Sequence, residues 1–498
     1  MNYWGFVWAG VLLTMQAAGQ ANAGRETMTT GQADQSDSTR RFTPTELKRD
    51  LAIFKTALRE AHPGLYAFHD SVYWAKRFAA VEQQMEKPMS ELAFYRLLNP
   101  VAVDIRCGHV KWFRDGKPDD LYAFYQTGLF PLRLHFQQGK AVHYFSYGTS
   151  VVPVGAEIVS INGKSMAEVT RQLLPQVFVD GTVESARWQF LGESFAGYYA
   201  SFIGPAKAFT VGYRVKGGAV KTVRLASVGV DEIRQSSRKT AGAGQRGDEH
   251  RVDTLGVTFP KPGVALLRIP VFMPQEGAQP WEAFLQNAFR RIQATGTHHL
   301  VLDLRNNEGG MDRWGAQLYA WLTDKPFRYY DHLTVASDGN LSFREYAWLP
   351  EQFDQLKAFI VRQGNEYLFT MNPSLGEQAP QPGAYTGQLY VLINGRSFSV
   401  TSEFSAIVRD RQRGVFIGEE TGGTLTADNS GAFANVRLPH SKLTLAVPLV
   451  RYHMSLQGKY NTSHGIVPEH LVVPRVEDLV AGRDVVLEKA FQLIALKP

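Results

Sequence analysis

Short apolar runs that end in polar turns alternate with amphipathic segments in the second half of the chain. Leu300–Leu304 and Leu389–Ile393 are short and rich in branched residues, as buried strands are. Residues 402–409 carry apolar side chains at a spacing that suits a helix packed on one side, and Val415–Ile417 is another short apolar run. The pattern predicts strand, tight turn, helix and strand, as in an α/β core.

The first half of the chain shows other periodicities. Apolar side chains recur at helical spacing from residue 44 to residue 62, and Pro63 then stops the predicted helix. Two further helical segments are expected at 74–85 and 90–98, which makes a helical N-terminal unit. Residues 132–228 contain shorter, strand-like segments and predict a separate β-rich domain.

The first residues resemble a secretory signal peptide. Trp4–Met15 is an apolar run, and Ala21–Ala23 forms an A-x-A cleavage site. No later apolar run reaches the ~18 residues that a membrane-spanning helix needs, so stable membrane insertion is not expected. We expect an exported protein, with the periplasm as first choice and secretion as second.

The composition of the chain mainly argues against certain partners and bonds. The 498-residue chain has a formal net charge of +6, but its Lys and Arg residues are dispersed and no nucleic-acid-binding motif occurs, so no nucleic acid partner is expected. Cys107 is the single cysteine, which rules out an internal disulfide, and we interpret it as a small packing residue. No metal-ligand spacing or cofactor motif is evident, so neither a metal nor a cofactor is predicted. The oligomeric state stays open.

Ser399 falls at the predicted strand-to-helix junction. A hydroxyl there can be exposed, and the first helical N–H groups point at the same spot, which suits a serine nucleophile. A serine before a helix is more often an N-cap, and three neighbouring hydroxyl residues compete for that role: Ser397, Thr401 and Ser402.

A glycine pair follows the strand at 300–304. Glycine lets the backbone approach a ligand with its N–H groups bare, so Gly309 and Gly310 are candidates for an oxyanion hole. The N–H of Val400 would supply the remaining donor. The alternative is a simple turn at the end of a strand.

Three segments carry a family resemblance: LDLRNNEGG, INGRSFSVTSEF and FIGEETGG, in this order. Together they resemble the core of the C-terminal-processing and tricorn-like serine peptidases, the tail-specific proteases, over most of the chain from about residue 254. The resemblance implies a crotonase/ClpP-like ββα superhelix and a serine peptidase, a hydrolase that acts on peptides or proteins. It assigns the nucleophile to Ser399 and an oxyanion N–H to Gly309 or Gly310.

The base comes from the end of the helical unit. The segment DIRCGH, which ends at His109, resembles the DGHT-like motif that provides a histidine in tricorn-like relatives. A lone histidine is more often structural, but a triad is defined by geometry and not by sequence order. We assign His109 as the general base, with His453 and His464 as alternatives.

Two departures from the family pattern matter. Relatives with a Ser–Lys dyad place a lysine just after the glycine turn, whereas here no lysine follows until Lys442, which favours a histidine base. Tricorn-like relatives place an acid shortly before a G-V-x-P-D-like segment, and residues 461–464 contain no carboxylate. The candidates for the orienting acid are Glu420, Glu469 and Glu419.

The segment Val154–Lys164 matches the turn-strand-turn signature of PDZ domains, and a helix is expected at 166–173. PDZ domains bind peptides as an added strand, although a spacer role is the alternative. The predicted architecture is α/β multidomain and is divided as follows: signal peptide 1–23, disordered leader 24–42, N-terminal helical domain 43–125, PDZ-like domain 126–230, linker 231–253, and catalytic core 254–498 with an insertion at 325–382.

Two rival functions remain at this stage. The retinoid-binding proteins of the eye's interphotoreceptor matrix share the same core, so a non-catalytic ligand-binding protein is one alternative. An esterase that uses the same serine is the other.

Overall fold

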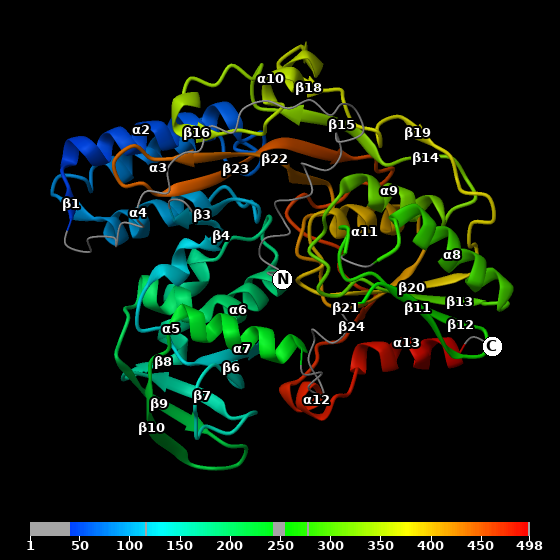
Figure 1. The fold of residues 1–498 in the computed structure, drawn as a ribbon, viewed down its shortest axis with the longest axis horizontal. Helices are drawn as coiled ribbons and strands as arrows, with labels where there is room; N and C mark the ends of the chain where they lie inside the picture. The colour runs from blue at the N-terminus through cyan, green and yellow to red at the C-terminus, as the bar shows by residue number, and fades with distance from the viewer. Residues whose placement is uncertain (1–39, 115–116, 243–253, 276–277, 497–498) are drawn as a thin grey trace.

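The computed structural model describes residues 40–114, 117–242, 254–275 and 278–496. The predicted signal peptide and nearly all of the predicted leader lie outside these residues. Figure 1 shows three regions: helices α2–α4 against two long strands, a β-rich middle unit, and an α/β core near the C-terminus.

The α/β core is built on a six-stranded sheet in the order β11-β12-β13-β20-β21-β24, parallel except for the edge strand β11. The runs predicted as buried strands form its centre. The strands are β11 (Gly256–Lys261), β12 (Val264–Arg268), β13 (His299–Asp303), β20 (Gln388–Ile393), β21 (Val415–Gly418) and β24 (His470–Leu471).

Helices cover both faces of this sheet, as a parallel sheet requires. Val391, Phe416 and their neighbours pack into the large core cluster, whereas Leu392 and Ile417 pack against α13 on the other face. The helices are α8 (Trp281–Ala294), α9 (Asp312–Ala320), α11 (Val400–Asp410), α12 (Val476–Ala481) and α13 (Val485–Ala495), and α13 lies across the sheet from α8, α9 and α11 (Figure 1).

A second, antiparallel sheet joins segments that are far apart in the sequence. Its order is β16-β22-β23-β15-β18-β17. Outside this order, β3 pairs antiparallel with the first residues of β23, Thr444 to Ala446. Its strands are β3 (Lys111–Arg114), β4 (Lys117–Leu121), β15 (Tyr330–Val335), β16 (Ala347–Trp348), β17 (Ile360–Gln363), β18 (Glu366–Phe369), β22 (Ala427–Arg437) and β23 (Thr444–Met454). The predicted insertion at 325–382 therefore contributes strands to a sheet of the core.

The N-terminal helices pack onto this second sheet. They are α2 (Pro44–Ala61), α3 (Ser71–Glu82) and α4 (Glu91–Val103), and their buried side chains share one hydrophobic cluster with the core. Thr43 and Glu46 form a capping box that fixes the start of α2. Asp50 on α2 is buried and accepts hydrogen bonds from the backbone of His440 and Ser441 in the β22–β23 turn. The helical unit is thereby tied to the hairpin of β22 and β23.

The middle unit contains a six-stranded sheet and the long helix α6 (Glu184–Phe202) packed against it. The sheet runs β10-β9-β7-β6-β5, and β8 pairs with β7. Its elements are β5 (Leu132–Gln137), β6 (Lys140–Ser146), β7 (Glu157–Ile161), β8 (Lys164–Ser165), α5 (Met166–Leu173), β9 (Ala208–Arg214) and β10 (Val220–Ala226). The helix expected at 166–173 agrees with α5.

One predicted boundary differs from the structure. The polar segment 231–253 was expected to be a linker, but Val230–Gly242 forms helix α7. Its apolar residue Ile233 packs on the middle unit, and the side chain of Ser236 donates to the carbonyl of Tyr147. Polar composition alone therefore does not predict this helix, because its contacts with the middle unit stabilise it.

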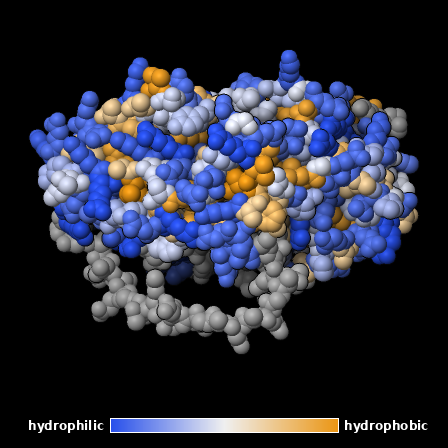
Figure 2. Space-filling view, turned by 90° about the horizontal axis from the view of Figure 1, so that it is seen from above, coloured by the Kyte–Doolittle hydropathy of each residue, from blue (hydrophilic) through white to orange (hydrophobic). Residues whose placement is uncertain are grey.

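Within the described ranges, no helix has the length and apolar character needed to cross a bilayer. Hydrophilic side chains predominate on the face drawn in Figure 2, and hydrophobic ones occur there in small groups.

The buried His62, at the end of α2, makes stability depend on pH. Burial and the nearby Arg451 charge lower its pKa to about 3, so the folded protein keeps His62 neutral while the unfolded chain binds a proton below pH 6.5. Stability is therefore complete above pH 6.5 and falls as the pH drops toward 3. We expect the parent to lose about 2.5 kcal/mol more unfolding free energy than His62→Gln between pH 6 and pH 4, measured by urea denaturation. Equal losses in both proteins would contradict this assignment.

Candidate active site

The two sequence motifs meet at one edge of the core sheet. β13 and β20 are neighbouring parallel strands, with Asp303 paired to Leu392, so the loops that follow them leave the sheet side by side. Ligand sites of α/β proteins lie at this carboxyl edge of the strands. One loop contains the glycine pair and the other ends at Ser399.

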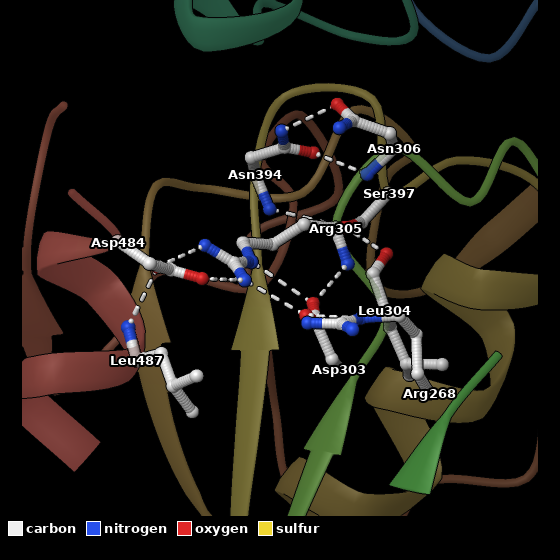
Figure 3. A network of polar contacts seen from close by, with 9 residues as sticks. All are labelled: Arg268, Asp303, Leu304, Arg305, Asn306, Asn394, Ser397, Asp484 and Leu487. Carbon is white, nitrogen blue, oxygen red and sulfur yellow. Dashed lines mark hydrogen bonds and ion pairs between the residues drawn. The ribbon is translucent and has the colours of Figure 1, made fainter. Parts of the chain in front are cut away.

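A polar network fastens these two loops together (Figure 3). The side chain of Asn394 accepts from the backbone N–H of Asn306 at 3.0 Å and donates to its side-chain oxygen at 2.8 Å. Ser397 Oγ donates to the carbonyl of Leu304 at 2.9 Å. Arg305 anchors the base of the network, because its guanidinium bridges Asp303 and Asp484 at 2.7 to 2.8 Å. The site therefore rests on a rigid edge of the sheet.

Ser399 has a strained backbone. Its φ of 55° and ψ of −128° lie in a region that non-glycine residues rarely adopt, and such strain is typical of functional sites. The residue precedes α11 but makes no side-chain capping bond to it. The rival hydroxyls of Ser397 and Ser402 are occupied by the carbonyls of Leu304 and Ser397. Ser399 therefore occupies the N-cap position of α11 without capping the helix through its side chain.

The glycine pair touches the serine turn. A Cβ on Gly309 would lie 2.7 Å from Ser399 Cβ and 2.9 Å from the Val400 nitrogen, so any side chain there would clash. Gly309 and Gly310 have φ values of 97° and 141°. The N–H of Gly309 donates to the Asn307 side chain at 2.9 Å, which engages one of the predicted oxyanion donors.

His109 reaches the site through strand pairing. It lies between α4 and β3, and β3 pairs with β23, which in turn pairs with β22. The imidazole stacks on the ring of Phe398, next to the serine, with ring centroids 4.5 Å apart. The front of the chain and the serine turn, almost 300 residues apart, are thus brought together.

Asp428, the second residue of β22, lies between these two side chains. Ser399 Oγ donates to Asp428 Oδ2 at 3.3 Å, and His109 Nδ1 lies 3.3 Å from Asp428 Oδ1. All three residues are buried. Sequence reasoning missed Asp428, although an aspartate inside a β-strand is unusual and could have drawn attention to it.

The neighbouring carboxyl groups set the charge of this cluster. Burial opposes ionisation of Asp428, but the His109 charge and hydrogen bonds from His109, Ser430 and Glu403 prevail and lower its pKa. Burial and the charge of Asp428 raise the pKa of Glu403 well above its usual value, and Tyr330 donates to Glu403 at 2.6 Å. At neutral pH, Asp428 is therefore ionised while Glu403 carries a proton.

Asp180 brings the middle unit into contact with the histidine loop. Its carboxylate accepts from the backbone N–H of Gly108 at 2.6 Å, and Gly181 N–H donates to the carbonyl of Arg106 at 3.0 Å. Burial and the charge of Asp428 raise the pKa of Asp180 to about 7. The loop that carries His109 is thereby held from two sides.

The acids proposed from the sequence have other partners. Glu420 accepts from His464 and from the Gly465 backbone, and Glu419 accepts from Gln189. Glu469 pairs with Arg409 and accepts from the Phe416 N–H at 2.7 Å. Asp428, and not these carboxylates, contacts His109, because the β22–β23 hairpin folds it over the serine turn.

The alternative bases His464 and His453, and also Lys442, contact residues outside the serine turn. His464 pairs with Glu420 on the surface, and His453 bonds to Thr334 and stacks on His332. Lys442 donates to the carbonyl of Pro439. These contacts leave His109 as the histidine that meets the serine turn.

Residues 263–472 match the sequence model of Peptidase family S41. This segment of the chain is therefore similar to the members of peptidase family S41. This confirms the family that the three motifs indicated. Two relatives, an uncharacterized protein of Chlamydia muridarum and a protein of Chlamydia trachomatis serovar D, are 27% and 25% identical over 218 residues. Each match covers 36% of this chain and 35% of the relative, so the matched segment spans about a third of their length.

Solved structures show a likeness in fold over most of the chain. The crystal structure of mature CPAF has a TM-score of 0.63 at 18% identity, and the alignment covers 91% of this chain and 97% of that one. Mature CPAF in complex with lactacystin gives a TM-score of 0.62 at the same identity, covering 91% and 98%. The likeness supports the predicted α/β multidomain architecture.

Proposed function

We propose that this protein is a serine peptidase that hydrolyses peptide bonds with Ser399 as nucleophile and His109 as general base. The observation that carries the proposal is the position of Asp428 between them, 3.3 Å from Ser399 Oγ and 3.3 Å from His109 Nδ1. A strained serine, an imidazole and an ionised carboxylate are the elements of a catalytic triad.

Asp428 orients the histidine in this proposal. Its low pKa makes it a weak base, so it holds the Nδ1–H of His109 and leaves Nε2 to accept a proton. The Ser399 hydroxyl, which donates to Asp428 at rest, turns to His109 as it attacks the substrate carbonyl. His109 then passes this proton to the leaving amine, and water releases the acyl group from Ser399.

Backbone amides stabilise the oxyanion. The N–H of Val400 is the first of α11, where the helix dipole adds positive potential. Gly310 supplies the second N–H, since that of Gly309 is already engaged by Asn307. Removing one oxyanion donor costs roughly two to three decades in kcat in other enzymes.

The finer predictions are part of the same proposal. The core adopts the crotonase-like ββα superhelix, the middle unit is PDZ-like and binds peptide, and the protein acts after export, in the periplasm. The turn that precedes β7 and helix α5 occur in the order that the PDZ signature requires. Peptides or proteins are the substrates.

Labelling with a fluorophosphonate probe tests the proposal directly, because the probe reacts only with an activated serine. The parent should be labelled, and Ser399→Ala should not. Ser405→Ala is the matched control: Ser405 is buried on the same helix, its hydroxyl has no hydrogen-bond partner, and labelling should persist. Equal labelling of the parent and Ser399→Ala would overturn the assignment. An unlabelled but folded parent would favour the ligand-binding alternative.

An esterase differs from a peptidase in the leaving group. Peptide hydrolysis requires protonation of a poor amine leaving group, so His109 is needed more for peptides than for activated esters. Comparing His109→Ala on matched peptide and ester substrates separates the two functions. Because mature CPAF has been solved in complex with lactacystin, that compound is also a suitable ligand to test here.

A further inference from the structure

We propose that Cys107, His109 and Asp180 form a zinc-binding site that overlaps the catalytic histidine, so that bound Zn²⁺ inhibits the enzyme. The inhibition rests on the proposed function, whereas the binding does not. Their ligand atoms all lie within 4.8 Å of one another.

The donor set suits zinc. Thiolate, imidazole and carboxylate are the ligands that Zn²⁺ takes in tetrahedral sites, whereas Mg²⁺ and Ca²⁺ prefer oxygen alone. Tetrahedral zinc ligands stand about 3.3 to 3.8 Å apart, so a contraction of about 1 Å closes the site. Three protein ligands leave a fourth position for water.

Unused polar atoms in the cluster support binding independently. Asp180 Oδ2 is buried and makes no hydrogen bond, and Asp180 is only 3% exposed. Burying such groups without a partner is costly. The Cys107 thiol has only a weak contact, to the Asn429 carbonyl at 3.8 Å. A metal would therefore replace few existing bonds.

The backbone holds the three ligands in place. Cys107 and His109 flank Gly108, whose N–H donates to the other carboxylate oxygen of Asp180 at 2.6 Å. A Cβ on Gly108 would lie 2.8 Å from the Phe398 ring, so a side chain between the two ligands would clash with that ring. The buried Asp428 carboxylate, whose pKa is lowered, adds a local negative charge that favours a dication.

Zinc binding would withdraw the catalytic base. The cation takes a lone pair of the His109 imidazole, and Cys107 binds as thiolate after its proton passes to solvent. His109 can then no longer accept the proton of Ser399. Activity should fall with zinc occupancy and return when a chelator removes the metal.

Binding is tested first on tag-free Ser399→Ala protein, which is inactive whether or not zinc binds. Co²⁺ is the spectroscopic probe: it should give an ultraviolet thiolate-to-cobalt charge-transfer band, and Zn²⁺ should abolish that band by displacement. Introducing Cys107→Ala into this background should remove the band. Zn²⁺ should also raise Tm, because it binds the folded state. Absence of both the band and the Tm shift would overturn the site.

Inhibition is tested next, with each variant's rate in Zn²⁺ divided by its own rate in chelator. Cys107→Ser and Asp180→Asn should weaken zinc inhibition by more than about 100-fold, because losing even a group that merely orients a metal ligand costs 10- to 100-fold. His332→Ala is the control: His332 stacks on His453 and bonds to the Asp331 carboxylate, outside the proposed zinc site, and inhibition should persist. Parent-like inhibition of Cys107→Ser would place the inhibitory metal elsewhere.

Discussion

Ser399→Ala should lower kcat for peptide hydrolysis by about six orders of magnitude, the cost of losing the nucleophile of a serine protease. The residual rate would come from the oxyanion N–H groups and substrate binding alone. KM should change little, because the alanine removes only the side-chain oxygen, and the contacts of Asn394, Asn306 and Ser397 keep the loops in place. Initial rates on a fluorogenic peptide library measure the effect.

A matched serine tests whether the loss is chemical. Ser405→Ala removes a buried hydroxyl without a hydrogen-bond partner on the same helix, so its kcat should stay within about twofold of the parent. Thermal unfolding of both variants checks folding. A Ser399→Ala protein that cleaves peptides at the parental rate would end the assignment of this serine.

Asp428→Asn should lower kcat by about four orders of magnitude. The amide nearly matches the carboxylate in size but cannot stabilise the imidazolium, and its N–H₂ group would favour the wrong tautomer of His109. Most of the change should appear in kcat. The loss should shrink on activated esters, since their leaving groups need less help from the histidine.

Asp410→Asn is the control for loss of a buried carboxylate. Asp410 ends α11 and accepts hydrogen bonds from the backbone of Gln457 and Gly458 and from Tyr460, none of which is in the site. This variant should lose stability and keep its kcat. If Asp428→Asn retained more than a tenth of the parental kcat, His109 would need another orienting group.

The central elements of the core were predictable because each carries a local signal. Leu389–Ile393 lies within β20 and Val415–Ile417 within β21. Both are short apolar runs bounded by turn residues, a pattern typical of buried strands. The helix expected at 402–409 begins two residues earlier, at Val400, where the strained Ser399 precedes it. The helix Val230–Gly242 and the strands within 325–382 were not predicted, because long-range docking, and not local composition, decides their structure.

The carboxylate that contacts His109 shows where sequence reasoning ends. Glu420 and Glu469 were chosen for their closeness to family motifs along the chain. Asp428 instead reaches the site through the hairpin of β22 and β23, whose pairing with β3 also brings His109. No periodicity in the chain encodes this register between strands more than 300 residues apart.

The sequence by itself determined the family, the strand-turn-helix that carries Ser399, and the glycine pair that closes over it, because these depend on neighbouring residues and on backbone freedom at a turn. Only the tertiary structure decided which carboxylate meets His109 and that Cys107 and Asp180 stand beside it. Those contacts arise from sheet pairing and burial, which act between residues that the chain keeps far apart.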